Sequence, residues 1–132
     1  MGISTDGEIC YGIIFEDGYE FPWDIDHEGD PEMWWISEIL KLTYNGYHEK
    51  KAILDVNPVP FELVNYCSGE YPMYILAVPG TVKTASRGNP KSFTLDELNV
   101  DEAASNKLVE FCKEHNLTGD SEIGWILSSY MG

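Results

Sequence analysis

The residues best suited to chemistry in this sequence are five carboxylates that alternate with other residues between positions 24 and 32. Carboxylates at alternate positions, followed by a glycine, begin many calcium-binding loops, because the oxygens converge and the glycine permits the turn. Asp24, Asp26 and Glu28 would be the first metal ligands. Calcium is therefore a candidate ion. However, Trp35 stands where such a loop needs a bidentate glutamate, and an acidic loop that only caps a helix explains the same pattern.

Tryptophans bracket the same carboxylates and indicate a second use for them. Aromatic residues dominate the energy of many protein interfaces, and carboxylates around them steer a basic partner toward the site. The predicted partner-binding residues are Trp23, Asp24, Asp26, Glu28, Asp30, Glu32 and Trp34. A core role explains the tryptophans equally well, because tryptophan is mostly buried in any folded protein.

The one basic stretch of the chain follows residue 80. Residues 71–95 contain no acid, and Lys83, Arg87 and Lys91 recur there at a spacing of four. With hydroxyl donors such as Thr81, they could bind a small anion such as a nucleotide, although no glycine-rich phosphate loop accompanies them. The alternative is that this stretch neutralises part of the acidic segment, within the molecule or across a homodimer.

Groupings that could catalyse a reaction are few. Cys112 and His115 lie three apart on a predicted helix and could face each other. Cys112 also falls on the apolar face of that helix, where a cysteine packs as a small hydrophobe. Apart from this pair, no cysteine or histidine shows zinc-ligand spacing. The sequence therefore favours a binding protein over an enzyme and indicates no cofactor other than calcium.

Local patterns predict the elements that position these residues. Segments rich in β-branched and aromatic residues predict strands at 8–16, 61–67, 72–78 and 123–131. Asp30 and Pro31 are typical of a helix start and predict a helix to Leu40 or Leu42. A second helix is expected from Asp96 or Asn99 to Asn116, and Ala52–Val56 is a possible short strand.

These elements and the overall composition limit the possible fold class and cellular compartment. A chain of 132 residues is the size of one domain, here residues 1–132, and the element order predicts an α+β fold. We expect a mixed, mostly antiparallel sheet of four to five strands with two helices. The formal charge of −15 disfavours direct contact with nucleic acid or an anionic membrane. Three scattered cysteines and no apparent leader are typical of a cytoplasmic protein.

Several short motifs spread along the chain resemble those of a group of small acidic proteins encoded by bacteriophages and prophages. The motifs lie within Gly2–Ile13, Glu20–Asp24, Trp34–Trp35, Tyr66–Tyr74 and Trp125–Gly132. The group has no established activity, so the resemblance implies a context and no functional residues. It implies an accessory protein in a bacterial cytoplasm, where such proteins often bind a host or defence protein.

Overall fold

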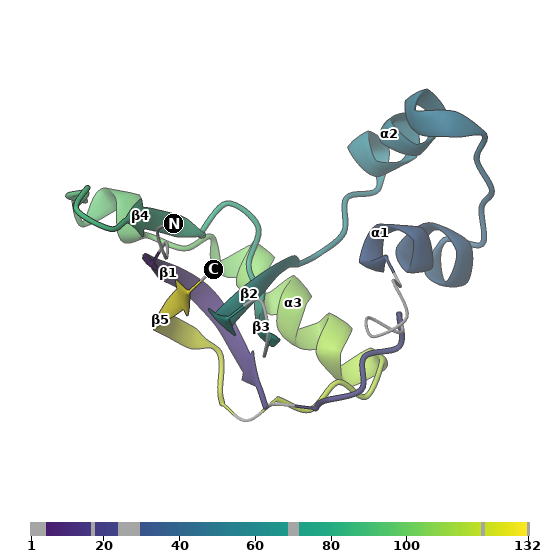
Figure 1. Cartoon of the computed structure of the whole chain (residues 1–132). Helices are drawn as coiled ribbons and strands as arrows, with labels where there is room; N and C mark the ends of the chain where they lie inside the picture. Colours follow the sequence, from purple (N-terminus) through teal and green to yellow (C-terminus); the bar gives the residue numbers. More distant parts are fainter. Residues whose placement is uncertain (1–4, 17, 24–29, 69–71, 120, 132) are drawn as a thin grey trace. The chain divides into compact units, whose positions relative to one another are not determined.

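A computed structural model describes residues 5–16, 18–23, 30–68, 72–119 and 121–131 of the chain. The expected α+β class is confirmed, because these residues form a mixed, mostly antiparallel sheet of five strands together with three α-helices (Figure 1). The chain divides into two compact units, which the sequence did not indicate. Unit 1 comprises Met1–Tyr19 and Pro60–Gly132, and unit 2 comprises Glu20–Val59.

The sheet of unit 1 is built on its first strand, β1 (Thr5–Phe15). The other strands are β2 (Glu62–Ser68), β3 (Pro72–Ala77), β4 (Lys83–Ser86) and β5 (Gly124–Met131). β1 pairs antiparallel with β5, β4 and β3, while β2 pairs antiparallel with β3 and parallel with β5. The pairings β1–β3–β2–β5–β1 therefore close into a ring, and β4 extends one edge of β1.

A buried threonine holds the bend that places β3 and β4 end to end along the same edge of β1. The Thr81 hydroxyl accepts a hydrogen bond from the Tyr11 amide at 3.1 Å and donates one to the Val78 carbonyl at 2.7 Å. The Val78 amide in turn donates to the Tyr11 carbonyl at 2.8 Å. Thr81 therefore has a structural role, which takes its hydroxyl away from the predicted anion site.

The two faces of β1 pack into different cores. On the inner face, Cys10 is clustered with Val64, Ile75 and Ala77 inside the ring of strands. On the other face, Ile13 and Phe15 are buried on the side of α3 (Glu102–Glu114) and the loop that follows it. Helix α3 is found in the predicted region but begins at Glu102, later than the predicted start at Asp96 or Asn99. The Asp101 carboxylate caps it by accepting a hydrogen bond from the Ala103 amide at 3.0 Å, and Asp96–Leu98 form a separate 3₁₀ turn. Helix α3 buries Leu108, Phe111 and Cys112.

Unit 2 is helical. Helix α1 (Pro31–Trp34) runs directly into a π-helical turn, η2 (Trp35–Ile39), which confirms the predicted helix start. The prediction of a possible short strand at Ala52–Val56 is wrong, because these residues form the second half of helix α2 (Gly46–Val56). The Trp35 indole N–H donates to the Asn57 carbonyl at 2.9 Å and so ties η2 to the end of α2. None of the helices described is long and apolar enough to cross a membrane.

Gly12 is the position at which the ring tolerates no side chain. A Cβ atom there would lie 2.3 Å from the Leu76 carbonyl oxygen and 2.8 Å from the Ala77 Cα, and both of these are backbone atoms. We expect Gly12→Ala to lower the free energy of unfolding by about 2 kcal/mol or more, in the range of overpacked cores. Urea unfolding measures the change.

Gly7→Ala on the same strand is the matched control, because its Cβ would meet nothing closer than the Ala85 carbonyl oxygen at 3.9 Å. We expect its stability to stay within about 0.5 kcal/mol of the parent. Equal effects of the two substitutions would show that the ring does not close tightly at Gly12.

Candidate functional site

The predicted acidic site is described at its two ends. Asp24, Asp26 and Glu28, which were predicted both as metal ligands and as partner-binding residues, lie outside the described residues. The structure describes the site from Trp23 backward and from Asp30 onward, within unit 2. One end, at Trp23, lies in a turn, and the other, at Asp30, is the N-cap of helix α1.

Aromatic rings hold the two ends together. The Trp23 ring stacks on Phe21 with centroids 4.8 Å apart and meets the Trp34 ring edge-on at 5.4 Å. Trp23 is 3% exposed, so its ring packs in the interior, whereas Trp34 is half-buried. The contact between the two rings therefore holds the ends of segment 24–33 together. We call Trp23 and Trp34 the aromatic clasp.

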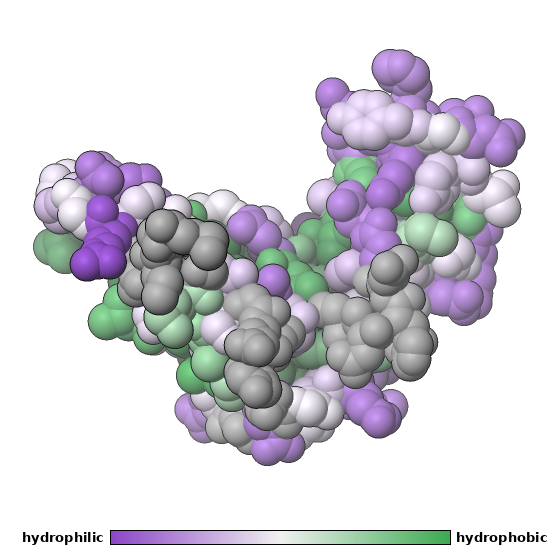
Figure 2. Space-filling view, viewed as in Figure 1, coloured by the Kyte–Doolittle hydropathy of each residue, from purple (hydrophilic) through white to green (hydrophobic). Residues whose placement is uncertain are grey.

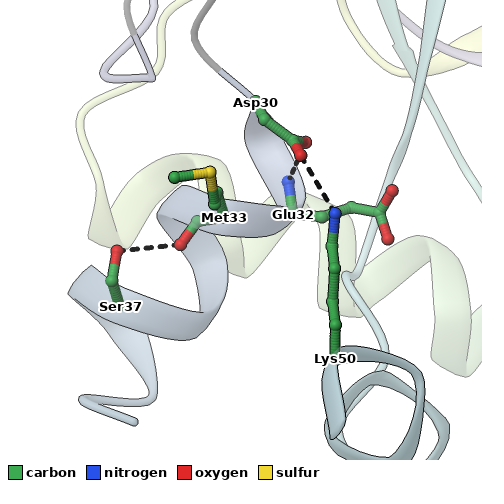
Figure 3. Close-up of polar contacts among 5 residues, drawn as sticks. All are labelled: Asp30, Glu32, Met33, Ser37 and Lys50. Atoms are coloured by element: carbon green, nitrogen blue, oxygen red, sulfur yellow. Dashed lines mark hydrogen bonds and ion pairs between the residues drawn. The ribbon is translucent and has the colours of Figure 1, made fainter. Parts of the chain in front are cut away.

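Asp30 has two structural bonds (Figure 3). Its Oδ1 accepts a hydrogen bond from the Glu32 amide at 2.9 Å, which caps helix α1 as predicted. Its Oδ2 accepts from Lys50 Nζ on α2 at 3.1 Å, and this hydrogen bond raises the pKa of Lys50. The Asp30 charge is thus partly neutralised within unit 2, while the Glu32 side chain is exposed to solvent.

The described residues do not assemble a metal centre. No group of three or more histidine, cysteine, aspartate or glutamate side chains within the described part of the chain is arranged to hold a metal ion. Calcium binding by Asp24, Asp26 and Glu28 stays a prediction, because those residues are not described.

The three predicted anion-binding residues lie on or just after β4. Lys83 is on the strand, and its ammonium group lies 5.5 Å from the centre of the Phe93 ring, a cation–π contact. Arg87 and Lys91 are exposed in the segment that follows. Lys83 therefore lies on a strand, whereas Arg87 and Lys91 follow it in a turn and an irregular segment. Two pockets of unit 1 have linings that include none of the three.

A carboxylate-lined pocket at one end of the ring was missed from the sequence. Its volume is about 540 Å³, and its lining includes Asp6, Glu8, Glu62 and Tyr130. Glu8 lies on the inner face of β1, where burial raises its pKa despite a 3.4 Å hydrogen bond from the Ser128 hydroxyl. Strand alternation puts Asp6 and Glu8 on the same face as Cys10, but only the ring pairing brings Glu62 to them.

A second pocket lies where the C-terminal end of α3 meets β1. Its volume is about 670 Å³, and it is lined by residues that include Ile13, Cys112, Lys113 and Glu122. Cys112 is buried, and burial raises the pKa of its thiol to about 11. The His115 ring packs on Phe111 at 4.6 Å. Cys112 is therefore a protonated core cysteine at neutral pH, and the geometry does not support a nucleophile.

The partly buried carboxylate of Glu8 predicts a pH-dependent stability. Because its pKa is raised in the folded state, the unfavourable contribution of Glu8 is fully present above that pKa and disappears as the pH falls below the pKa of the unfolded chain. We expect Glu8→Gln to stabilise the protein at neutral pH. We expect no effect near pH 3, roughly one unit below the pKa of an ordinary glutamate, because Glu8 is then protonated in both the folded and the unfolded chain. Urea unfolding at the two pH values gives the difference. The exposed Glu16→Gln controls for the change in net charge, and equal stabilisation by both variants would contradict the assignment.

The three cysteines are free and differ in accessibility. Cys67 is exposed, whereas Cys10 and Cys112 are buried and each has a pKa of about 11. We expect a thiol reagent to modify Cys67 alone in the folded protein at pH 8 and all three cysteines in denaturant, because the thiolate is the reactive form. Mass spectrometry counts the adducts. Rapid modification of Cys112 in the folded protein would contradict its core position.

Comparison with family models, with curated proteins and with solved structures finds no match to this chain.

Proposed function

We propose that the protein is a non-enzymatic binding protein, and that its acidic segment, Trp23–Trp34, captures a basic protein. The partner we propose is a protein of a bacterial host or of its defence systems. The role would be that of a phage or prophage accessory protein in the bacterial cytoplasm.

The aromatic clasp is the observation that carries this proposal. It holds the two ends of segment 24–33 together, with the rings of Trp23 and Trp34 5.4 Å apart. A segment whose two ends are held together has fewer conformations to lose on binding than an open tail. Binding of a partner to its carboxylates therefore costs less conformational entropy. Trp23 contributes by closing the segment, while Trp34 and Glu32 stay accessible.

Charge supports a basic partner over an acidic one. Unit 2 has nine acids and three lysines, so its formal charge is −6 with histidines neutral. One of the three lysines, Lys50, already pairs with Asp30. A carboxylate-rich surface speeds the encounter with a basic protein, and salt screens the attraction.

Charge reversal in the acidic segment tests the proposal. The triple variant Asp24→Lys, Asp26→Lys and Glu28→Lys changes the formal charge from −15 to −9, because each substitution adds two units. We expect it to lose capture of basic proteins from a bacterial lysate by at least about tenfold, as for removal of hot-spot contacts. Capture by the parent protein should weaken between low and high salt.

A matched control separates the position of the charges from their sum. The variant Glu97→Lys, Glu110→Lys and Glu114→Lys changes the charge by the same amount at exposed positions of unit 1. It should capture the same partners as the parent. Circular dichroism checks that both variants are folded. Unchanged capture by the Asp24, Asp26 and Glu28 variant, or equal loss in both variants, would overturn the proposal.

A further inference from the structure

The carboxylate-lined pocket at the end of the ring also borders the edge of a strand. Four consecutive residues of β2 belong to its lining, namely Glu62, Leu63, Val64 and Asn65. Side chains of successive strand residues point to opposite faces, so four residues in a row line one pocket along the edge of the strand and not on one face. The pocket therefore faces the main chain of β2 as well as the carboxylates.

This edge of β2 has few strand partners. β2 pairs with β3 along its other edge from Glu62 to Cys67, and it pairs with β5 only at Cys67 and Ser68. In an antiparallel pair, every second residue points its N–H and C=O groups away from the partner strand. Within the described part of the chain, no further strand pairs with residues 62–65, so these groups border the pocket. Such an edge is a template on which an extended peptide can add a strand.

The part of the pocket that β1 contributes is polar. Asp6 and Glu8 lie on the inner face of β1, and both line the pocket. The residues across from them on β4 and β5 are polar as well: Ser86, Thr84, Tyr130 and Ser128. Figure 2 shows apolar residues over the part of unit 1 where Figure 1 labels β1 and β5, so the pocket is a polar site beside an apolar surface.

The pocket carries negative charge that no base in its lining neutralises. Among the described residues that line it, three are acids and none is lysine, arginine or histidine. Lys83 on β4 lies opposite Ile9, so it belongs to the other face of the sheet. Its ammonium group lies 5.5 Å from the centre of the Phe93 ring. The pocket is therefore complementary to a positively charged group.

The carboxylates lie close enough to one another to act on the same groups. Burial, and then the charges of Glu8 and Glu62, raise the pKa of the Cys10 thiol to about 11. Burial also raises the pKa of Glu8, and the charge of Asp6 adds to this effect. A cation held between these carboxylates offsets the repulsion between them, which favours binding of a lysine or arginine side chain.

The exposed edge of β4 is less suited to a basic strand. β4 has only four residues and carries Lys83, and the chain then turns at Gly88 and Pro90. Short length, lysine and proline are the features with which natural sheets protect their edges. The edge of β2 at residues 62–65 contains neither lysine nor proline, and its nearest charges are negative.

We propose that an extended, basic segment of the partner protein binds in this pocket, adds a strand to the edge of β2 and places a lysine or arginine side chain between Glu8 and Glu62. The inference rests on the basic partner of the proposed function, but the contact lies in unit 1 and not in the acidic segment of unit 2. Main-chain hydrogen bonds to β2 supply binding, and the carboxylates select basic side chains. The pocket volume of about 540 Å³ is within the roughly 300–1,000 Å³ of ligand sites.

An NMR titration of the full chain with a peptide tests the site. The probe is a peptide of about six residues, the length of an ordinary strand, in which lysine and valine alternate. We expect it to shift the amide signals of residues 62–65 and to slow their hydrogen exchange, because the added strand pairs with them. The same peptide with glutamate in place of lysine should not bind. Peptide shifts confined to residues outside β2, or equally tight binding of free lysine amide, which forms no strand, would overturn the proposal.

Two variants with the same change of charge locate the cation contact. Glu62→Lys should raise the dissociation constant of the peptide by about tenfold or more, as for loss of an interface hot spot. Glu97→Lys, at an exposed position of unit 1 that is not part of the pocket lining, should change it by less than about threefold. Glu8→Gln is a second pocket variant, should Glu62→Lys not fold. Equal effects of a folded pocket variant and Glu97→Lys would show that the peptide binds elsewhere.

The triple variant Asp24→Lys, Asp26→Lys and Glu28→Lys separates this site from the proposed function. We expect it to lose capture of basic proteins from a lysate, while the peptide still shifts the amide signals of β2. If the peptide does not reach β2 although the parent protein captures basic proteins, the strand-addition site is wrong and the proposed function stands. If the peptide binds at β2 but the triple variant captures as well as the parent, the acidic segment is not the capture surface and the β2 site stands.

Discussion

The fold of unit 1 depends on the close approach of β3 to β1 at Gly12. β1 pairs with β5 along one edge and with β4 and then β3 along the other, and Gly12 is opposite both Ala77 and Gly124. The Leu76 carbonyl occupies the space of the missing side chain. Because β3 reaches β1 there, β2 can join β3 to β5 and close the ring. The small inner residues Cys10 and Ala77 fit the narrow interior that results.

Ring closure also explains why polar groups lie on the inner face. The packed interior occupies the middle of the ring, and β1 continues beyond it toward Asp6, where Glu62 and Tyr130 line the open end. Carboxylates there reach water at the cost of partial burial, which raises the pKa of Glu8. The apolar side chains of this part of β1, Ile9 and Tyr11, are therefore left on the opposite face of the strand.

The sequence was sufficient wherever local chemistry decides the structure. Asp30 caps a helix that begins with proline, and four apolar segments form strands. The sequence was insufficient wherever contacts between distant segments decide the structure. Ala52–Val56 has a composition suited to a strand, but it continues a helix that begins at Gly46 and that Trp35 ties down through Asn57. The carboxylates of the pocket at the end of the ring come from β1 and β2, which both pair with β3 and with β5 but not with each other.

The aromatic residues show the same limit at the candidate site. Adjacent acids and tryptophans predicted an interface, and the composition could not separate a tryptophan that contacts a partner from one that holds the loop. The packing of Trp23 on Phe21 and Trp34 makes that distinction, because a ring 3% exposed stabilises the segment from within.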